Sequence, residues 1–255
     1  MVARMLLELL GLETTPFTQF LSLAVGGVGF YFLVSGLSYM IFFVWGRKYF
    51  HPNYAENKEE LRAQMRWGVI GVIGNAAFML PLTYLMATGH SQAYWDVGER
   101  GWLYLVGSLV VYLAFTETCV YWAHRWLHSD VGYKHFHHIH HEWRTTTSWV
   151  SMAFHPFDSF LQALPHHLMV FLIPMHGGIY FVMLTFVAIW SVIIHDRVSI
   201  VRFGMLNYTG HHTLHHWYYR CNYGQFFTFW DRLMGTHMDP AKEEKNPEIP
   251  EGLLR

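Results

Sequence analysis

The sequence has few charged residues and almost no cysteine. Charged residues make up 14% of its 255 residues, against roughly 25% in a soluble domain. The formal net charge of −1 argues against nucleic-acid binding, which needs a concentrated excess of basic side chains. Cys119 and Cys221 form neither a CxxC motif nor a disulfide framework, so we expect free thiols in or facing a reducing compartment. The composition, 53% hydrophobic, indicates an integral membrane protein.

Long apolar segments account for much of the first half of the chain. The first, from Phe20 to Trp45, carries no charge, and its length suits a helix that crosses a hydrocarbon core of about 30 Å. The second and third run from about Trp67 to Met86 and from about Trp102 to Trp122. Residues 159–195 hold prolines and a Gly-Gly pair between shorter apolar runs, which predicts a hairpin that enters and leaves on one side. We expect an all-α integral membrane protein with about four to five membrane helices.

The polar segments predict how the helices are oriented. The loop from Gly46 to Arg66 holds five basic residues, and the positive-inside rule places such a loop in the cytoplasm. Counting one crossing per apolar segment, the chain returns to the cytoplasmic side after Trp122. We therefore expect a multi-pass protein of the endoplasmic reticulum, or of the cytoplasmic membrane in a bacterium, with a helical cap that faces the cytoplasm.

The chain is interpreted as a single membrane-embedded domain over residues 1–255. Residues 1–123 are mainly membrane anchor, residues 124–240 carry the chemistry, and residues 241–255 form a tail. Residues 1–15 are amphipathic and lack a small-residue cleavage site, which indicates an interfacial helix rather than a signal peptide. The tail is charged and contains proline, so we expect it to be frayed.

Histidine is concentrated in the second half of the chain. Residues 124–141 read HRWLHSDVGYKHFHHIHH, and residues 211–216 read HHTLHH. Histidines three and four residues apart share one face of a helix, and imidazoles from neighbouring helices can hold iron, zinc, copper or nickel. A histidine tag or a weak metal-binding tract is the alternative, but these segments lie inside the chain beside apolar stretches. Eight well-spaced histidines are too many for one tetrahedral zinc, so the pattern predicts a two-metal centre.

The ligand types that are missing narrow the chemistry. No cysteine accompanies the histidine segments in a metal-binding spacing, which argues against iron–sulfur and structural zinc sites. The HExxH motif is absent, so a zinc protease of that kind is not expected. Histidine clusters at the cytoplasmic end of membrane helices suit a di-iron centre that activates O₂ and acts on an apolar substrate.

The histidine segments resemble those of a known superfamily. HRWLH (124–128), HHIHH (137–141) and HHTLHH (211–216) look like the three histidine boxes of the fatty acid hydroxylase/sterol desaturase superfamily. Within it, the chain most resembles the C-5 sterol desaturases (lathosterol oxidases). The resemblance covers about Glu117 to Pro240, whereas residues 1–100 are similar only in hydropathy. The supporting phrases are YKHFHHIHHEW (133–143), AFHPFDSFLQALPHH (153–167), SVIIHD (191–196) and CNYGQFFTFWDRLMGT (221–236).

This resemblance implies a reaction, a cofactor and a set of ligands. Two iron ions would activate O₂ to remove hydrogen from an unactivated C–H bond of a sterol or other apolar lipid, with electrons from a donor such as cytochrome b5 or a ferredoxin. Zinc can replace iron in a structure, because imidazole binds both. His195 is added as a ninth ligand, and His155 is a further candidate, with a helix-entry hydrogen bond as its alternative role. The implied ligands, which are also the catalytic residues, are His124, His128, His137, His140, His141, His212, His215 and His216.

Other polar residues are expected to support these ligands. Ligating histidines commonly pass their second N–H to a carboxylate or carbonyl, and the candidate acids are Glu142, Asp158, Asp196 and Asp231. A solvated or capping acid is the alternative for each. Asn222 and Tyr223 are candidates for orienting the third box, and Trp230–Arg232 for a structural tether. Histidines outside the preferred spacings are expected beside the ligands or at the surface (His135, His138, His211) or without a function (His51, His90, His176, His237).

A basic patch around the boxes predicts where an electron donor docks. Charge complementarity mostly raises association rates, so a patch of this kind suits an acidic donor protein. Ordinary positive-inside bias is the alternative explanation. The patch consists of Arg125, Lys134, Arg144, Arg220 and Arg232.

Alternative functions remain beside the C-5 desaturase. A C-4 sterol methyl oxidase or a lipid hydroxylase would use the same boxes, and the choice depends on fine positioning of the substrate. A membrane metal carrier or sensor is the alternative from a different class. Transport would place ionisable residues near mid-membrane, whereas these histidines crowd one end of the helices.

Overall fold

A computed structural model of the chain describes residues 11–250 and 252–254, so most of the interfacial helix expected at residues 1–15 lies outside the described residues. Helices dominate, and the sheet in the described part pairs two short parallel strands, which confirms the predicted all-α fold. The long helices are α2 (Pro16–Tyr39), α4 (Lys58–Ala87), α5 (Gly101–Leu127), α7 (Pro156–Leu172) and α8 (Gly177–His195). The short elements are η1 (Met40–Trp45), α3 (Arg47–Phe50), β1 (Ala93–Tyr94), η2 (Val97–Glu99), α6 (Asp130–Gly132), η3 (Tyr133–His137), η4 (His140–Glu142), η5 (Ser148–Met152), β2 (Met175–His176), α9 (Thr209–Tyr218), α10 (Phe229–Leu233) and α11 (Pro240–Glu243).

Four helical runs in the described residues are long and apolar enough to cross a membrane. They are Pro16–Trp45, which joins α2 to η1, and the helices α4, α5 and α8. Large apolar side chains on these helices, such as Leu33, Val106 and Val182, are exposed, as expected for surfaces that contact lipid. The predicted hairpin at 159–195 corresponds to α7 and α8. Helix α7 has 17 residues, which is near the lower limit for crossing a bilayer.

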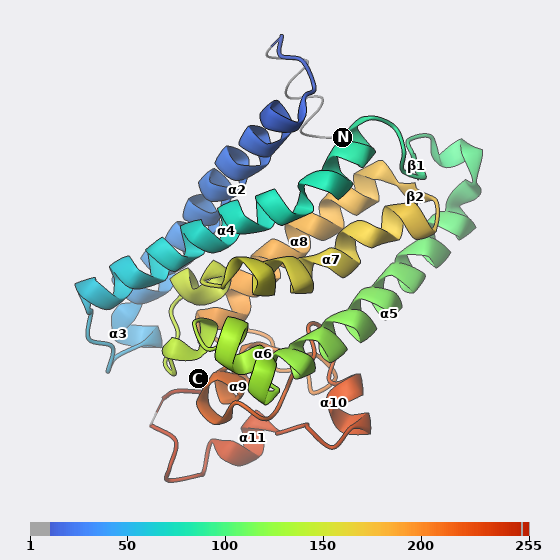
Figure 1. Cartoon of the computed structure of the whole chain (residues 1–255). Helices are drawn as coiled ribbons and strands as arrows, with labels where there is room; N and C mark the ends of the chain where they lie inside the picture. Colours follow the sequence, from blue (N-terminus) through green and yellow to red (C-terminus); the bar gives the residue numbers. More distant parts are fainter. Residues whose placement is uncertain (1–10, 251, 255) are drawn as a thin grey trace.

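The two ends of the helical bundle differ. Figure 1 shows β1 and β2 at one end, and α3, α6 and α9 toward the other. His51 Nε2 lies 2.9 Å from the carbonyl oxygen of Asp196, the residue after α8, so the connection between η1 and α4 lies beside the C-terminal end of α8. The basic loop Gly46–Arg66 therefore begins at the bundle end that also holds the histidine boxes.

Local sequence signals explain where the helices begin. Thr15 and Thr18 form a capping box before α2, with Pro16 at the first helical position, where proline loses no intrahelical hydrogen bond. Asn57 accepts hydrogen bonds from the backbone N–H groups of Glu59 and Glu60 at the start of α4. The two carboxylates in this first turn also favour the positive end of the helix dipole.

The C-terminal tail packs against α9. Ile249, Leu253 and Leu254 are buried and share an apolar cluster with Leu214 and Cys221. The carbonyl of Leu254 also accepts a hydrogen bond of 3.3 Å from the guanidinium of Arg202. The prediction of a frayed tail is wrong, because these apolar side chains are buried against α9.

Helices α2 and α4 approach closely at Gly68. The hydroxyl of Tyr31 donates a 2.8 Å hydrogen bond to the carbonyl of Trp149 in η5, and the Tyr31 ring and hydroxyl occupy the space that a side chain on Gly68 would need. Gly68 therefore lets α2 and α4 hold η5, which follows the second histidine box.

We predict that Gly68→Ala lowers the free energy of unfolding by about 1–3 kcal/mol, because overpacking displaces Tyr31. Gly26→Ala on α2 is the matched control, since nothing lies within 4 Å of a Cβ there. Thermal unfolding in detergent should show a lower Tm for the first variant only. Equal Tm values for the two variants would contradict the assignment.

Candidate metal centre

Nine buried or half-buried histidines converge from four parts of the chain. His124 and His128 lie at the C-terminal end of α5. His137 lies in the short π-helix η3, and His140 and His141 lie in the 3-10 helix η4. The other four come from the last residue of α8 and from α9. They form two groups, in each of which the ligand nitrogens all lie within 4.8 Å of one another: His124, His128, His137, His141 and His215 in one, and His140, His195, His212 and His216 in the other.

In the five-histidine group, the Nε2 atoms point at one another. His128 Nε2 lies 3.2 Å from His215 Nε2, and His137 Nε2 lies 3.1 Å from His141 Nε2. His124 Nε2 is buried and has no hydrogen-bond partner among the described residues. Buried polar atoms are rarely left without a partner, so these nitrogens fit a shared metal ion.

The four-histidine group repeats this arrangement around His195. His195 Nε2 lies 3.3 Å from His140 Nε2 and 2.9 Å from His212 Nε2. His216 Nε2 is buried without a hydrogen-bond partner among the described residues. The donor set is imidazole alone, which suits iron or zinc.

Acceptors on the far side of several rings determine which nitrogen faces the group. His137 Nδ1 lies 2.7 Å from Asp158 Oδ2, with both side chains fully buried. Backbone carbonyls accept from the Nδ1 atoms of three other clustered histidines. His124 bonds the Tyr223 carbonyl at 3.0 Å, and His215 bonds the Cys221 carbonyl at 2.7 Å. His195 bonds the Ser191 carbonyl at 2.6 Å. These partners hold the proton on Nδ1 and leave Nε2 free to bind a metal.

Burial disfavours the protonated form of five of these histidines. Burial and neighbouring histidines lower the pKa of His140, His141, His212, His215 and His216 well below the usual 6.5. Desolvation disfavours the charged imidazolium. Metals bind the unprotonated ring, so the groups are ready for metal near neutral pH.

The remaining predicted histidines lie outside both groups. His155 is the N-cap of α7, and its Nδ1 accepts a hydrogen bond from the Phe157 N–H, which is the alternative considered for it. His135 and His138 are exposed. His211 is buried beside Tyr208 and His237. His51 is buried against Phe43 and bonds the Asp196 carbonyl, so it supports the end of α8.

Among the candidate acids, Asp158 is the one whose carboxylate contacts a clustered histidine. Asp196 accepts hydrogen bonds from Ser38 Oγ and the Val198 N–H instead, and Glu142 is exposed. Asp231 accepts from the N–H groups of Tyr223 and Gly224, so it acts on the loop that faces His124. Asn222 ties the start of α9 to Met238 through hydrogen bonds to the carbonyls of His211 and Met238.

Sequence reasoning missed two residues that support the site. Thr146 donates a 2.7 Å hydrogen bond to the carbonyl of His195, and nothing in the sequence singles it out. Glu117 is buried within α5 and accepts hydrogen bonds from three backbone N–H groups of residues 225–227. The sequence alone could have identified Glu117, since a carboxylate inside an apolar segment is a functional candidate by default.

A small cavity of about 60 Å³, lined by both polar and apolar side chains, adjoins both groups. His124 and His140 form part of its wall, and α8 contributes Val187, Trp190 and Ile194. The cavity therefore lies between the metal centre and the C-terminal half of α8.

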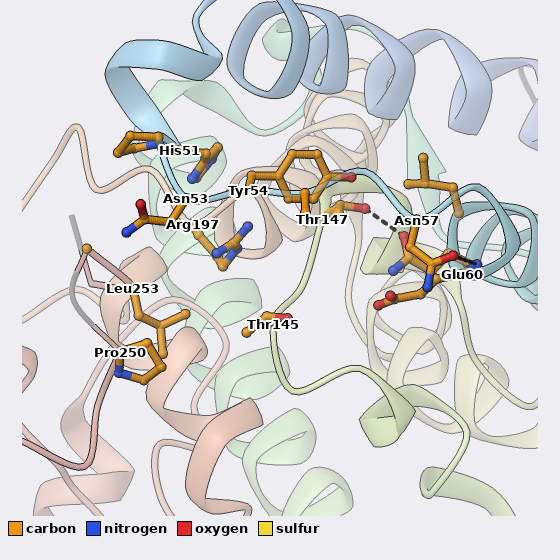
Figure 2. Close-up of a pocket in the computed structure, with 15 residues that line it drawn as sticks. His51, Asn53, Tyr54, Asn57, Glu60, Thr145, Thr147, Arg197, Pro250 and Leu253 are labelled. Atoms are coloured by element: carbon orange, nitrogen blue, oxygen red, sulfur yellow. Dashed lines mark hydrogen bonds between the residues drawn. The ribbon is translucent and has the colours of Figure 1, made fainter.

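A larger cavity, of about 230 Å³, lies beside the connection between η1 and α4. Figure 2 shows polar side chains around it, with Arg197 and Glu60 on different sides. None of the nine clustered histidines lines it. Arg197 Nε donates to the carbonyl of Thr146, so the wall of this cavity helps to hold the segment that bonds His195.

The basic residues predicted as a docking patch differ in their contacts. The Arg144 guanidinium lies 5.0 Å from the Trp217 ring centre, Arg125 donates to the Tyr121 hydroxyl, and Arg232 donates to the Gly204 carbonyl. Lys134 and Arg220 are exposed. Arg220 lies two residues after the end of α9, which makes it the member of the patch closest in sequence to the third box.

Comparisons with known proteins relate most of the chain to sterol-modifying enzymes. A family model described as fatty acid hydroxylase matches residues 109–236. A protein from Gibberella zeae named Delta(7)-sterol 5(6)-desaturase is 36% identical over 228 residues, which cover 88% of this chain and 69% of that protein. Human lathosterol oxidase is 37% identical over 246 residues, or 92% of this chain and 81% of that protein. Rat lathosterol oxidase is 36% identical over 230 residues, or 88% and 76%. No solved structure matches the chain.

We predict that Asp158→Asn weakens metal binding about 10–100-fold, the usual cost of removing a partner that orients a ligand. The amide cannot accept the His137 N–H as strongly as the carboxylate does. Competition of Zn²⁺ against a chelator measures the change. Glu142→Gln, at an exposed acid beside His141, is the control and should retain wild-type affinity. Equal affinity in the two variants would remove Asp158 from the site.

Proposed function

The chain belongs to the fatty acid hydroxylase family, and we propose that it is an O₂-dependent di-iron enzyme that introduces the C-5 double bond into a sterol or sterol-like lipid. It is a membrane oxidoreductase of the sterol desaturase kind. The observation that carries the di-iron proposal is the division of nine histidines into two adjoining groups. All the ligands are imidazoles, and this donor set suits iron.

The metal chemistry and the protein's part in it are distinct. Iron bound in the two groups would supply the reduction of O₂ and the removal of hydrogen from an unactivated C–H bond. The histidines hold the metals, and acceptors on the Nδ1 atoms of four of them hold those rings in place. The apolar wall of Val187, Trp190 and Ile194 excludes water and leaves dispersion contacts to orient the lipid. A cavity of about 60 Å³ is large enough for only part of a lipid.

The proposed topology places the metal centre at the cytoplasmic face. The basic loop Gly46–Arg66 begins at the same end of the bundle as the histidines, as the contact between His51 and the Asp196 carbonyl supports. An electron donor such as cytochrome b5 or a ferredoxin would then meet exposed basic side chains beside α9. The apolar substrate would come from the bilayer.

Sterol analysis tests the reaction. In a host that accumulates a C5-saturated sterol, the wild-type protein should yield a product lighter by two hydrogens, measured by mass spectrometry. His140→Ala should abolish the product, because His140 belongs to the four-histidine group. His138→Ala is the matched control, since this exposed neighbour lies in the same box but outside both groups.

The other outcomes separate the alternatives. A product heavier by one oxygen would move the enzyme to the hydroxylases and keep the metal site. An unchanged sterol profile from iron-loaded, reduced protein would contradict the sterol assignment.

Arg220→Glu tests donor docking. We expect lower donor-dependent turnover, with a deficit that shrinks as salt rises, because screening weakens interactions between exposed charges. Iron content should not change. Arg100→Glu at the opposite end of α5 is the control and should leave turnover unaffected. Turnover of Arg220→Glu equal to that of the control at low salt would exclude this docking surface.

A further inference from the structure

Glu117 is a carboxylate inside a helix that is apolar enough to cross a membrane. It is 4% exposed, and its oxygens face the loop between α9 and α10. Oε1 accepts hydrogen bonds from the N–H groups of Gln225 at 3.1 Å and Phe227 at 3.2 Å, and Oε2 accepts from Phe226 at 2.9 Å. Placing an ionisable group in such a helix costs free energy. The presence of Glu117 and its three hydrogen bonds therefore suggests a specific role.

Asp231 binds the preceding residues of the same loop. Its Oδ1 accepts from the Tyr223 N–H at 2.9 Å, and its Oδ2 from the Gly224 N–H at 2.8 Å. Five consecutive backbone N–H groups, residues 223–227, therefore point at two carboxylates. Gly224 lies where they meet, since a Cβ there would lie 3.0 Å from Asp231 Oδ2 and 3.2 Å from Glu117 Oε1.

The clamped loop also orients two histidines. The Tyr223 carbonyl accepts from His124 Nδ1 at 3.0 Å, and the Cys221 carbonyl accepts from His215 Nδ1 at 2.7 Å. Both rings belong to the five-histidine group. In the four-histidine group, His195 bonds the Ser191 carbonyl within its own helix instead, so the clamp acts on one group of ligands.

We propose that Glu117 is a positioning residue for the metal in the five-histidine group. Its carboxylate fixes residues 225–227 of the loop. The carbonyls of Tyr223 and Cys221, earlier in the same loop, then hold His124 and His215 with Nε2 turned toward the metal. This inference rests on the proposed function, because it assumes a metal in each group. It differs from general support of the fold, since it predicts the loss of one metal and retention of the other.

Glu117→Gln provides the direct test. The amide keeps the shape but replaces one accepting oxygen with an NH₂ group, which must face at least one backbone N–H. When the amide NH₂ faces a backbone N–H, two donors meet and both stay without an acceptor in a buried place. The loop should then shift away from His124 and His215. The iron content, measured by elemental analysis after a fixed chelator challenge, should fall from two Fe²⁺ per chain to one. The wild-type value of two assumes one ion in each group. Glu142→Gln, the same change at an exposed acid, should keep two.

Double variants identify which metal is lost. The iron losses caused by two substitutions should not add when both act on the same histidine group. They should add when the substitutions act on separate groups. Glu117→Gln combined with His124→Ala should keep one Fe²⁺, the number expected for His124→Ala alone. Glu117→Gln combined with His212→Ala should keep none, because His212 belongs to the other group.

The outcomes separate this inference from the proposed function. Retention of both metals by folded Glu117→Gln would overturn the positioning role, and so would equal loss from both groups in the double variants. A lower Tm with two metals per folded chain would also overturn it, since the residue would then serve the fold alone. If the wild-type protein holds no Fe²⁺ under the same challenge, the di-iron proposal itself fails.

Discussion

The structure depends on packing nine imidazoles closely beside one another, with eight of them buried and His128 half-buried. Ring nitrogens of different histidines approach to 2.9 Å at His195 and His212, and to 3.1 Å at His137 and His141. Protonated rings would repel at these distances. Burial prevents this by disfavouring the charged form, as the lowered pKa values of the box histidines show. Desolvation then leaves each remaining N–H in need of an acceptor, so the fold must supply acceptors as well as ligands.

This need explains why so many separate segments meet at one end of the bundle. A helix offers histidines on one face only every three or four residues, so α5 and α9 each supply a few ligands and cannot build two groups alone. Turns η3 and η4 add three more, and the end of α8 adds His195. The membrane helices fix where these segments begin and end. Carbonyls near the helix ends and in the loop after α9 provide acceptors, because backbone groups there are not all used by a helix.

Much of this architecture could be predicted from local patterns. Apolar length predicts the membrane helices, and the spacing of the box histidines predicts that they gather into a metal centre. The division into groups could not be predicted, because the adjacent His140 and His141 belong to different groups. The chain changes from the π-helix η3 to the 3-10 helix η4 between His137 and His140, so the spacing rules of a regular α-helix do not apply there. The packed tail was missed for a similar reason, since Leu253 and Leu254 find their apolar partners on α9, far away in sequence.

The contacts that support the metal ligands are of two kinds, those made by backbone carbonyls and those made by side chains. Tyr223 and Cys221 act through carbonyl oxygens, which every residue type possesses, so no motif can reveal them. Asp158 and Glu117 act through carboxylates, and each lies where a charge is costly. A buried acid can therefore be recognised in the sequence as a supporting residue, whereas the backbone carbonyls cannot. At Glu117 the cost of burial is offset by three backbone N–H groups that lie more than 100 residues further along the chain. The acid in an apolar helix indicates that a partner exists, and the folded chain shows that the partner is the loop behind two metal ligands.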